Sequence, residues 1–173
     1  MILIGLRAAG KSTLGRELAD DLQVKFADLD DLALKQLNAA SVDEVFAQCG
    51  EPAWRNAEQR AFALWLLSPS GVLACGGGAP CIPEVRHSMQ SSGACVVYLH
   101  AGVEALVARR QRHDRDRPLL FGAGGLEEEV ARAYEERDLV FRSLAHHIIE
   151  VDEQESTDSL ADLRQIFAEK CSN

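Results

Sequence analysis

Gly5-Leu6-Arg7-Ala8-Ala9-Gly10-Lys11-Ser12-Thr13 fits the pattern G-x-x-x-x-G-K-[ST] of a phosphate-binding loop, or P-loop. In this motif backbone N–H groups and a helix N-terminus hold phosphates, while the Lys contacts the outer phosphates and the hydroxyl ligates Mg²⁺. The flanks agree, because residues 1–4 predict a buried strand and residues 11–22 predict a helix with leucines on one face. A predicted strand before the loop and a predicted helix after it disfavour the alternative interpretation, in which the segment is a Gly-rich turn that only connects two elements. The predicted nucleotide-binding residues of this loop are Gly5, Ala8, Ala9, Gly10, Lys11, Ser12 and Thr13.

Ala8 is the unusual residue of this loop, because many P-loops of this subtype have Gly at that position. An Ala side chain fits without strain where the backbone φ angle is negative. We therefore interpret Ala8 as tolerated, with the expectation of a negative φ, and its effect on the loop stays open.

An acidic motif, Asp28-Leu29-Asp30, follows the first helix and a short apolar stretch. Side chains alternate between the two faces of a strand, so at the end of a strand the carboxylates of Asp28 and Asp30 would point to the same face, although the loop that follows can turn one of them. They would then lie where a metal ion and a phosphoryl acceptor meet beside the P-loop. The alternative is that Asp28, Asp30 and Asp31 cap the next helix, and for Asp31 we prefer that interpretation.

Composition limits the class of protein. A length of 173 residues predicts a single domain, residues 1–173, that buries roughly 70% of its unfolded surface. The net charge of −9 argues against general binding to nucleic acids or membrane surfaces. Five of the fourteen arginines nevertheless lie between Arg109 and Arg117, which suggests a small anionic ligand. The five cysteines show no pairing typical of disulfides or zinc, and neither an export signal nor a membrane span is evident, so we expect a cytoplasmic protein.

Short apolar runs alternate with helical patterns along the chain. We expect strands near residues 1–4, 24–27, 71–75, 95–99 and 148–151, and helices near 11–22, 31–37, 42–48, 52–67, 83–91, 102–112, 126–144 and 158–170. This alternation predicts an α/β fold, a parallel sheet covered by helices on both faces. Two stretches interrupt it: 31–65 suggests a substrate-binding insertion, and 112–125 suggests a mobile lid.

The order of motifs resembles one family, the shikimate kinases, over nearly the whole chain. The matching residues are Gly5 to Thr13, Asp28-x-Asp30, Trp54-Arg55 with Glu58, Gly76-Gly77-Gly78-Ala79, Arg110, Arg117-Pro118-Leu119-Leu120 and Glu136-Arg137. The resemblance implies ATP-dependent phosphorylation of the 3-hydroxyl of shikimate, which gives shikimate 3-phosphate and ADP on the route to chorismate. It also implies the nucleoside-monophosphate-kinase-like fold of the P-loop NTPases, with five parallel strands in the order 2-3-1-4-5.

The resemblance also assigns roles on the acceptor side. Lys11 would reach the β- and γ-phosphates, Ser12 would ligate Mg²⁺ directly, and Asp28 would hold the metal through water. Asp30 would accept a hydrogen bond from the attacking hydroxyl and can act as its base. An acceptor carboxylate suits the planar fork of arginine, so Arg55 and Arg137 fit that role by resemblance. The remaining substrate-binding residues would be Glu58, Gly76, Gly77 and Gly78.

Two of these substrate-binding assignments have a simple physical basis. Glu58 lies three residues after Arg55, so on a helix it can hold the guanidinium in place, although an ordinary surface ion pair is the alternative. Three glycines after a buried strand, at positions 76–78, permit close backbone approach to a ligand.

On the nucleotide side, Arg117 in the lid would neutralise the transferring phosphoryl group. Arg110 would reach the nucleotide near its adenine or phosphates, and Gln154 is a candidate neighbour of the adenine. For Arg109, Arg112 and Arg115 we favour a solvated basic face that raises the local concentration of anions.

Three functions stay open on the sequence. The leading one is a shikimate kinase that uses ATP and Mg²⁺ and acts as a monomer. The second is a related small-molecule kinase, such as a gluconate kinase. The third is a kinase-like module that senses ATP or shikimate without turnover.

Overall fold

The computed structural model describes residues 1–113, 125–152 and 156–171 of the chain. Its centre is a sheet in which every neighbouring pair of strands is parallel, in the order β2-β3-β1-β4-β5. This confirms the predicted topology. The strands are β1 (Ile2–Ile4), β2 (Phe26–Asp28), β3 (Val72–Ala74), β4 (Val96–His100) and β5 (His147–Glu150).

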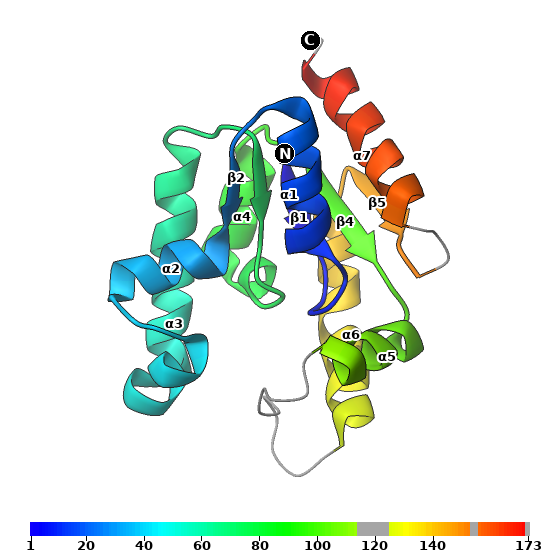
Figure 1. The fold of residues 1–173 in the computed structure, drawn as a ribbon. Helices are drawn as coiled ribbons and strands as arrows, with labels where there is room; N and C mark the ends of the chain where they lie inside the picture. Colours follow the sequence, from blue (N-terminus) through cyan, green and yellow to red (C-terminus); the bar gives the residue numbers. More distant parts are fainter. Residues whose placement is uncertain (114–124, 153–155, 172–173) are drawn as a thin grey trace.

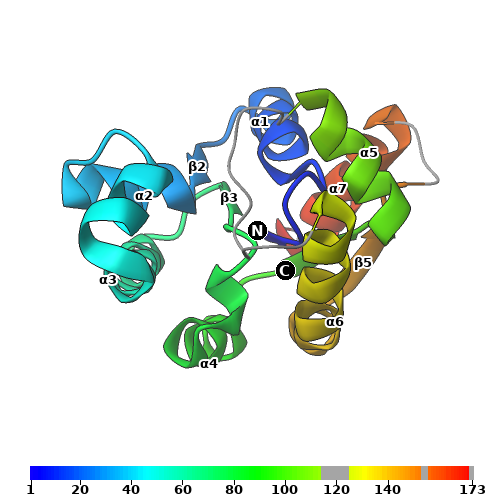
Figure 2. The ribbon, with the colours of Figure 1, turned by 90° about the horizontal axis from the view of Figure 1, so that it is seen from below.

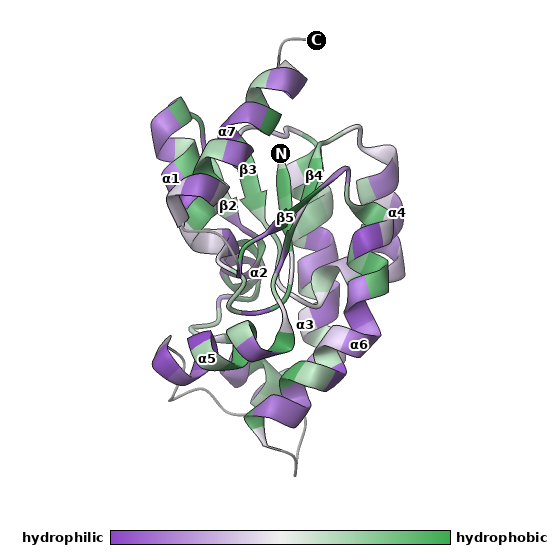
Figure 3. Ribbon diagram, turned by 90° about the vertical axis from the view of Figure 1, so that its right-hand side faces the viewer, coloured by the Kyte–Doolittle hydropathy of each residue, from purple (hydrophilic) through white to green (hydrophobic). Residues whose placement is uncertain are grey.

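Helices cover both faces of the sheet, as expected for strands that are apolar runs rather than alternating patterns. Helices α1 and α7 pack on one face, with α4 and α6 on the other (Figure 3). Helices α2 and α3 extend from the β2 edge (Figures 1 and 2). The helical elements are α1 (Lys11–Leu22), α2 (Leu29–Leu37), α3 (Val42–Leu66), the 3-10 helix η1 (Ala79–Cys81), α4 (Pro83–Ser91), α5 (Val103–His113), α6 (Leu126–Leu144) and α7 (Ser156–Cys171).

The core lies where β1 and β3 meet these helices. Every residue of β1 and β3 is buried, and the side chains of Ile2, Leu3 and Ile4 have no exposed surface. These two strands are apolar on both faces, so burying them fully is favourable, and only the central positions of the sheet are covered on both sides. They therefore form the centre of the sheet. Among the described residues, no helix is both long enough and apolar enough to span a membrane.

The prediction was wrong in detail around β2. The strand begins at Phe26 rather than at residue 24, because the Val24 amide bonds to the Ala19 carbonyl and continues the turn that ends α1. Helix α2 begins at Leu29 rather than at residue 31, because Asp28 is its N-cap and accepts a hydrogen bond from the Asp30 amide. Asp30 therefore lies in the first turn of a helix and not on the strand.

The two helices predicted at residues 42–48 and 52–67 form the two parts of α3. Gly50, with φ 78° and ψ 170°, interrupts the helical backbone between them, and Pro52 opens the second part. The second part carries Arg55 and Glu58 toward the sheet. The interruption lets this segment approach at its own angle instead of continuing the axis of the first.

The parallel arrangement brings the carboxyl ends of all strands to one edge of the sheet. The P-loop follows β1, Asp28 ends β2, and the glycine triplet follows β3. On the other side of β1, His100 ends β4 and Val151 follows β5. In open parallel sheets, ligands bind outside the carboxyl ends of the strands near a reversal of strand order. Of the predicted site residues, the P-loop, Asp28 and the glycine triplet therefore lie at this edge.

Candidate active site

The P-loop joins β1 to the N-terminus of α1, where Gly10 is the N-cap residue. Lys11 is 8% exposed, and its Nζ donates to the Leu6 carbonyl oxygen at 2.8 Å, so the ammonium group curls back over the loop. Burial lowers the pKa of Lys11, while the nearby carboxylates of Asp30 and Asp28 oppose this shift. A helix N-terminus with a buried cation is a binding site for anions.

Ala8 contradicts the expectation of a negative φ angle. Its φ is 69°, in the left-handed region where an L side chain crowds its own backbone. The neighbouring Ala9 amide bonds to the Leu6 carbonyl, which holds the loop in a tight turn. The loop therefore keeps the backbone conformation that a glycine would adopt freely, at a cost of about 1 kcal/mol.

Asp28 caps α2, the alternative predicted for it from the sequence, and it also contacts the P-loop; its metal role stays a prediction. One carboxylate oxygen accepts a hydrogen bond from Ser12 Oγ at 2.6 Å, and the other caps α2 through the Asp30 amide at 3.1 Å. The cap thus orients Asp28 toward the P-loop hydroxyl. This pair of hard oxygen donors suits Mg²⁺, which takes few protein ligands and keeps several waters. Within the described ranges, no three His, Cys, Asp or Glu side chains form a metal-binding group.

Asp30 is the carboxylate best placed for acid–base chemistry. Its Oδ1 is buried and has no hydrogen-bond partner within the part of the chain that the structure describes. Burial and, second, the nearby Asp28 carboxylate together raise the pKa of Asp30 to about 6, against the opposing effect of Lys11 and Arg55. A carboxylate in this range can both hold and accept a proton near neutral pH.

Arg55 and Glu58 form an ion pair in which Glu58 is buried and Arg55 is partly exposed, so the alternative of an ordinary surface ion pair is wrong. Glu58 is 1% exposed, and its Oε2 accepts from Arg55 Nη1 at 2.7 Å. Glu51 Oε1 accepts from Arg55 Nε at 3.0 Å and from Nη2 at 2.8 Å. Burial raises the pKa of Glu58 to about 7, although Arg55 acts in the opposite direction. These contacts fix the guanidinium plane and engage three of its five N–H groups.

A side chain at Gly76 or Gly78 would displace the charged groups that lie against this turn. A Cβ atom on Gly76 would lie 2.4 Å from Asp30 Oδ1 and 3.0 Å from Glu58 Oε1. A Cβ atom on Gly78 would lie 2.4 Å from Arg55 Nη1. Gly77 differs, since its carbonyl accepts from Arg137 Nη1 at 3.3 Å. The triplet therefore brings Asp30, Glu58, Arg55 and Arg137 around one short turn.

The two arginines of α5 that were predicted to form a solvated basic face, Arg109 and Arg112, differ in their surroundings. Arg109 bonds to the Val151 carbonyl and, at 3.5 Å, to the Ala8 carbonyl, so the prediction of a merely solvated residue was wrong for it. Arg112 is exposed, in agreement with that prediction. The sequence offers no signal that separates the two, because only the packing of α5 decides which arginine faces the P-loop.

Arg110 is 5% exposed and pairs with Glu129 of α6 at 2.6 Å. The guanidinium thereby links α5 to α6, and its contact with the nucleotide stays a prediction. The residues predicted for the lid between 114 and 124, with Arg115 and Arg117 among them, and Gln154 lie outside the described residues.

A family model described as "Shikimate kinase" matches residues 7–170, nearly the whole chain. The chain belongs to the shikimate kinase family. A shikimate kinase of Pseudomonas syringae pv. syringae is 40% identical over 158 residues, covering 89% of this chain and 87% of that relative. Shikimate kinase 2 of Escherichia coli O81 is 39% identical over 171 residues, covering 98% and 95%.

A solved structure agrees with this family assignment. The shikimate kinase from Acinetobacter baumannii in complex with shikimate aligns with a TM-score of 0.86 at 30% identity, covering 97% of this chain and 92% of that one. The predicted P-loop fold with a sheet order of 2-3-1-4-5 and the resemblance stated from the motifs are both confirmed. Membership of this family makes the chain an enzyme that uses ATP as a co-substrate.

The strain at Ala8 leads to a stability prediction. We expect Ala8→Gly to raise the free energy of unfolding by about 1 kcal/mol, because glycine adopts the left-handed conformation without a steric penalty. Urea denaturation of both proteins measures this difference. Ala9→Gly is the matched control, since Ala9 is buried in the same loop without a positive φ and should lose stability on the same change. Equal loss in both variants would contradict the strain at Ala8.

Proposed function

We propose that the enzyme transfers the γ-phosphoryl group of ATP to the 3-hydroxyl of shikimate, giving shikimate 3-phosphate and ADP. The observation that carries this proposal is the grouping of Asp30, Arg55, Glu58 and Arg137 around the glycine turn, beside the P-loop of a chain in the shikimate kinase family. A buried carboxylate of the protein can accept a proton from a hydroxyl of the acceptor, and two guanidinium groups can bind a carboxylate of the acceptor. Together they select an acceptor that has both groups, a carboxylated polyol.

On the acceptor side, Arg55 would bind the substrate carboxylate with the N–H groups that Glu51 and Glu58 leave available. Arg137 would supply the second cation across the glycine turn. The acceptor hydroxyl would donate to Asp30 Oδ1 and pass its proton there as its oxygen bonds to the γ-phosphorus. The bond from that phosphorus to the bridging oxygen of ADP breaks in the same transfer.

On the nucleotide side, Lys11 would leave the Leu6 carbonyl and contact the β- and γ-phosphates. Mg²⁺, when bound, would neutralise phosphate charge, with Ser12 as direct ligand and Asp28 holding it through water. The Ser12–Asp28 contact supports this assignment, since it holds two oxygen donors 2.6 Å apart beside the loop. Arg110, Arg117 and Gln154 are proposed to complete the nucleotide site, with Arg117 on the lid neutralising charge in the transition state.

The other two functions are less well supported. The family model that matches this chain and the relatives reported above are described as shikimate kinases, which supports shikimate rather than gluconate as the acceptor. A sensing module without turnover does not need an unbonded carboxylate whose pKa is tuned to about 6. Cytoplasmic location and a monomeric state remain proposals drawn from composition and family.

A substrate comparison tests the proposed function. We expect ADP release, followed with a coupled assay in the presence of Mg²⁺ and ATP, with shikimate and only background rates with gluconate. Quinate, which lacks the ring double bond but keeps a carboxylate and hydroxyls, tests how strictly the acceptor is recognised. A folded protein without turnover on shikimate would refute the proposal.

Replacing the proposed base separates its role from that of the metal site. We expect Asp30→Asn to lower turnover by at least about 100-fold, because the hydroxyl loses its proton acceptor, while ATP affinity measured by calorimetry stays nearly unchanged. Asp31→Asn is the matched control, since Asp31 is an exposed acid on the same turn. A parallel loss of ATP affinity in Asp30→Asn would place Asp30 in the metal site instead.

The raised pKa of Asp30 predicts a pH dependence. Since the ionised form accepts the proton, kcat/KM for shikimate should rise with pH through about 6. The free energy of unfolding should change in the opposite direction, because folding raises the pKa of Asp30. The contribution of Asp30 to stability is fully present below about pH 4 and is lost as the pH rises through about 6. Asp30→Asn should therefore gain about 1–3 kcal/mol over the parent at pH 8, and this gain should vanish near pH 4. A gain that does not change with pH would contradict the shifted pKa.

A further inference from the structure

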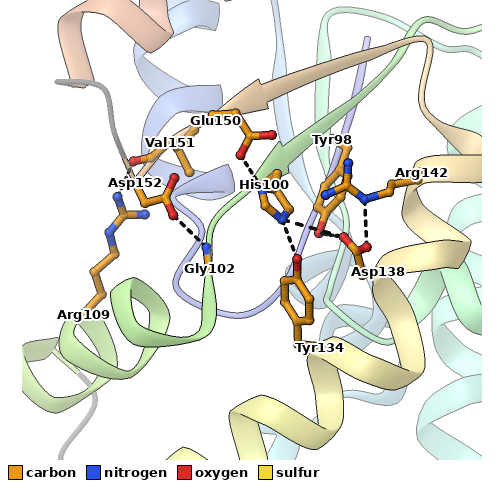
Figure 4. A network of polar contacts seen from close by, with 10 residues as sticks. All are labelled: Tyr98, His100, Gly102, Arg109, Tyr134, Asp138, Arg142, Glu150, Val151 and Asp152. Atoms are coloured by element: carbon orange, nitrogen blue, oxygen red, sulfur yellow. Dashed lines mark hydrogen bonds and ion pairs between the residues drawn. The ribbon is translucent and has the colours of Figure 1, made fainter.

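A second group of polar side chains lies where β4, β5 and α6 meet (Figure 4). Its centre is Asp138 of α6, which is 14% exposed. Tyr98 of β4 donates its hydroxyl to Asp138 Oδ1 at 3.0 Å, and Arg142 Nε donates to Asp138 Oδ2 at 2.7 Å. Both oxygens of the carboxylate are therefore engaged, one by the sheet and one by its own helix.

His100 ties this centre to the end of β5. Its Nδ1 pairs with Glu150 Oε2, and its Nε2 contacts the Tyr134 hydroxyl at 2.8 Å and lies 3.8 Å from Asp138 Oδ1. Burial and the hydrogen bond to Asp138 raise the pKa of Tyr98, so the phenol stays a donor over the working pH range. Two residues of β4, Tyr98 and His100, thus contact α6, and Glu150 of β5 is connected to that helix through His100.

Arg137, the residue beside Asp138, faces the acceptor site. Neighbouring residues on an α-helix point about 100° apart, so these two side chains reach different parts of the sheet. Asp138 reaches Tyr98 on β4, while Arg137 reaches the Gly77 carbonyl after β3. One turn further on, the Phe141 ring packs edge-on against Tyr98 at 5.2 Å between centroids. These contacts define the rotation of α6 about its own axis.

We propose that Asp138 is a positioning residue for the acceptor: its hydrogen bond with Tyr98 sets the rotation of α6 that presents Arg137 to the substrate carboxylate. The inference rests on the proposed function, in which Arg137 binds that carboxylate. Asp138 contacts no substrate itself. A bound guanidinium recognises a carboxylate through two parallel N–H groups, so a small rotation of the helix degrades the fit even though the charge is unchanged.

The test is a change in KM without a matching change in kcat. We expect Tyr98→Phe, which keeps the buried ring and removes only the hydroxyl, to raise KM for shikimate about tenfold. KM for ATP and kcat should change by less than about twofold, because the P-loop and Asp30 are untouched. Asp138→Leu, which has a side chain of similar length but accepts no hydrogen bond from Tyr98, should act in the same direction. Arg132→Gln is the control, since it removes an exposed ion pair with Glu136 on the same helix.

A double-mutant cycle with Arg137 tests whether Asp138 acts through it. In an Arg137→Ala background, Tyr98→Phe should leave KM for shikimate unchanged, because the group that it positions is gone. If Tyr98→Phe raises KM equally in both backgrounds, or lowers only thermal stability, the positioning role is refuted. The activity of the parent enzyme distinguishes a failure of this inference from a failure of the proposed function. If the parent does not phosphorylate shikimate, it is the proposed function that is refuted.

Discussion

The close approach of Asp30 and Glu58 to the backbone at Gly76 is the contact on which the acceptor site depends. A Cβ atom there would overlap Asp30 Oδ1 and crowd Glu58 Oε1. Without a side chain at this position, two carboxylates from α2 and α3 can lie against the turn that follows β3. The same turn leaves room for Arg55 at Gly78 and bonds to Arg137 at Gly77. Four charged groups from three helices thus share one small space.

Sharing that space determines the electrostatics of the site. Removing carboxylates from water raises their pKa values, and the cations of Arg55 and Lys11 offset only part of this effect, so Asp30 titrates near 6 and Glu58 near 7. Buried charges of this kind reduce stability at neutral pH, and the proposed function uses one of them as a proton acceptor. The strained backbone at Ala8 adds a smaller destabilisation in the P-loop. The buried carboxylates and the strained loop therefore lower the free energy of unfolding in exchange for the chemistry of the proposed site.

Helix α6 connects the two halves of the site. Its Glu129 pairs with Arg110 of α5, the helix whose Arg109 bonds to the P-loop at Ala8. Its Arg137 reaches the glycine turn on the acceptor side. The contacts of Asp138 with β4 hold this helix between them. The orientation of one helix therefore bears on both sides of the site.

Much of this protein follows from local patterns in the sequence. The P-loop, the parallel sheet and the cap formed by Asp28 depend on neighbouring residues and on hydrophobic periodicity, which act over a few positions of the chain. The family motifs also named Asp30, Arg55 and Arg137. Tertiary structure alone decided that Glu58 is buried, that Ala8 has a positive φ, and that Arg109 rather than Arg112 faces the P-loop. It also gave Asp138 its partner forty residues away in the chain. These properties depend on which elements pack together, because desolvation, close contact and the choice between neighbouring side chains are set by surroundings that no short stretch of sequence contains.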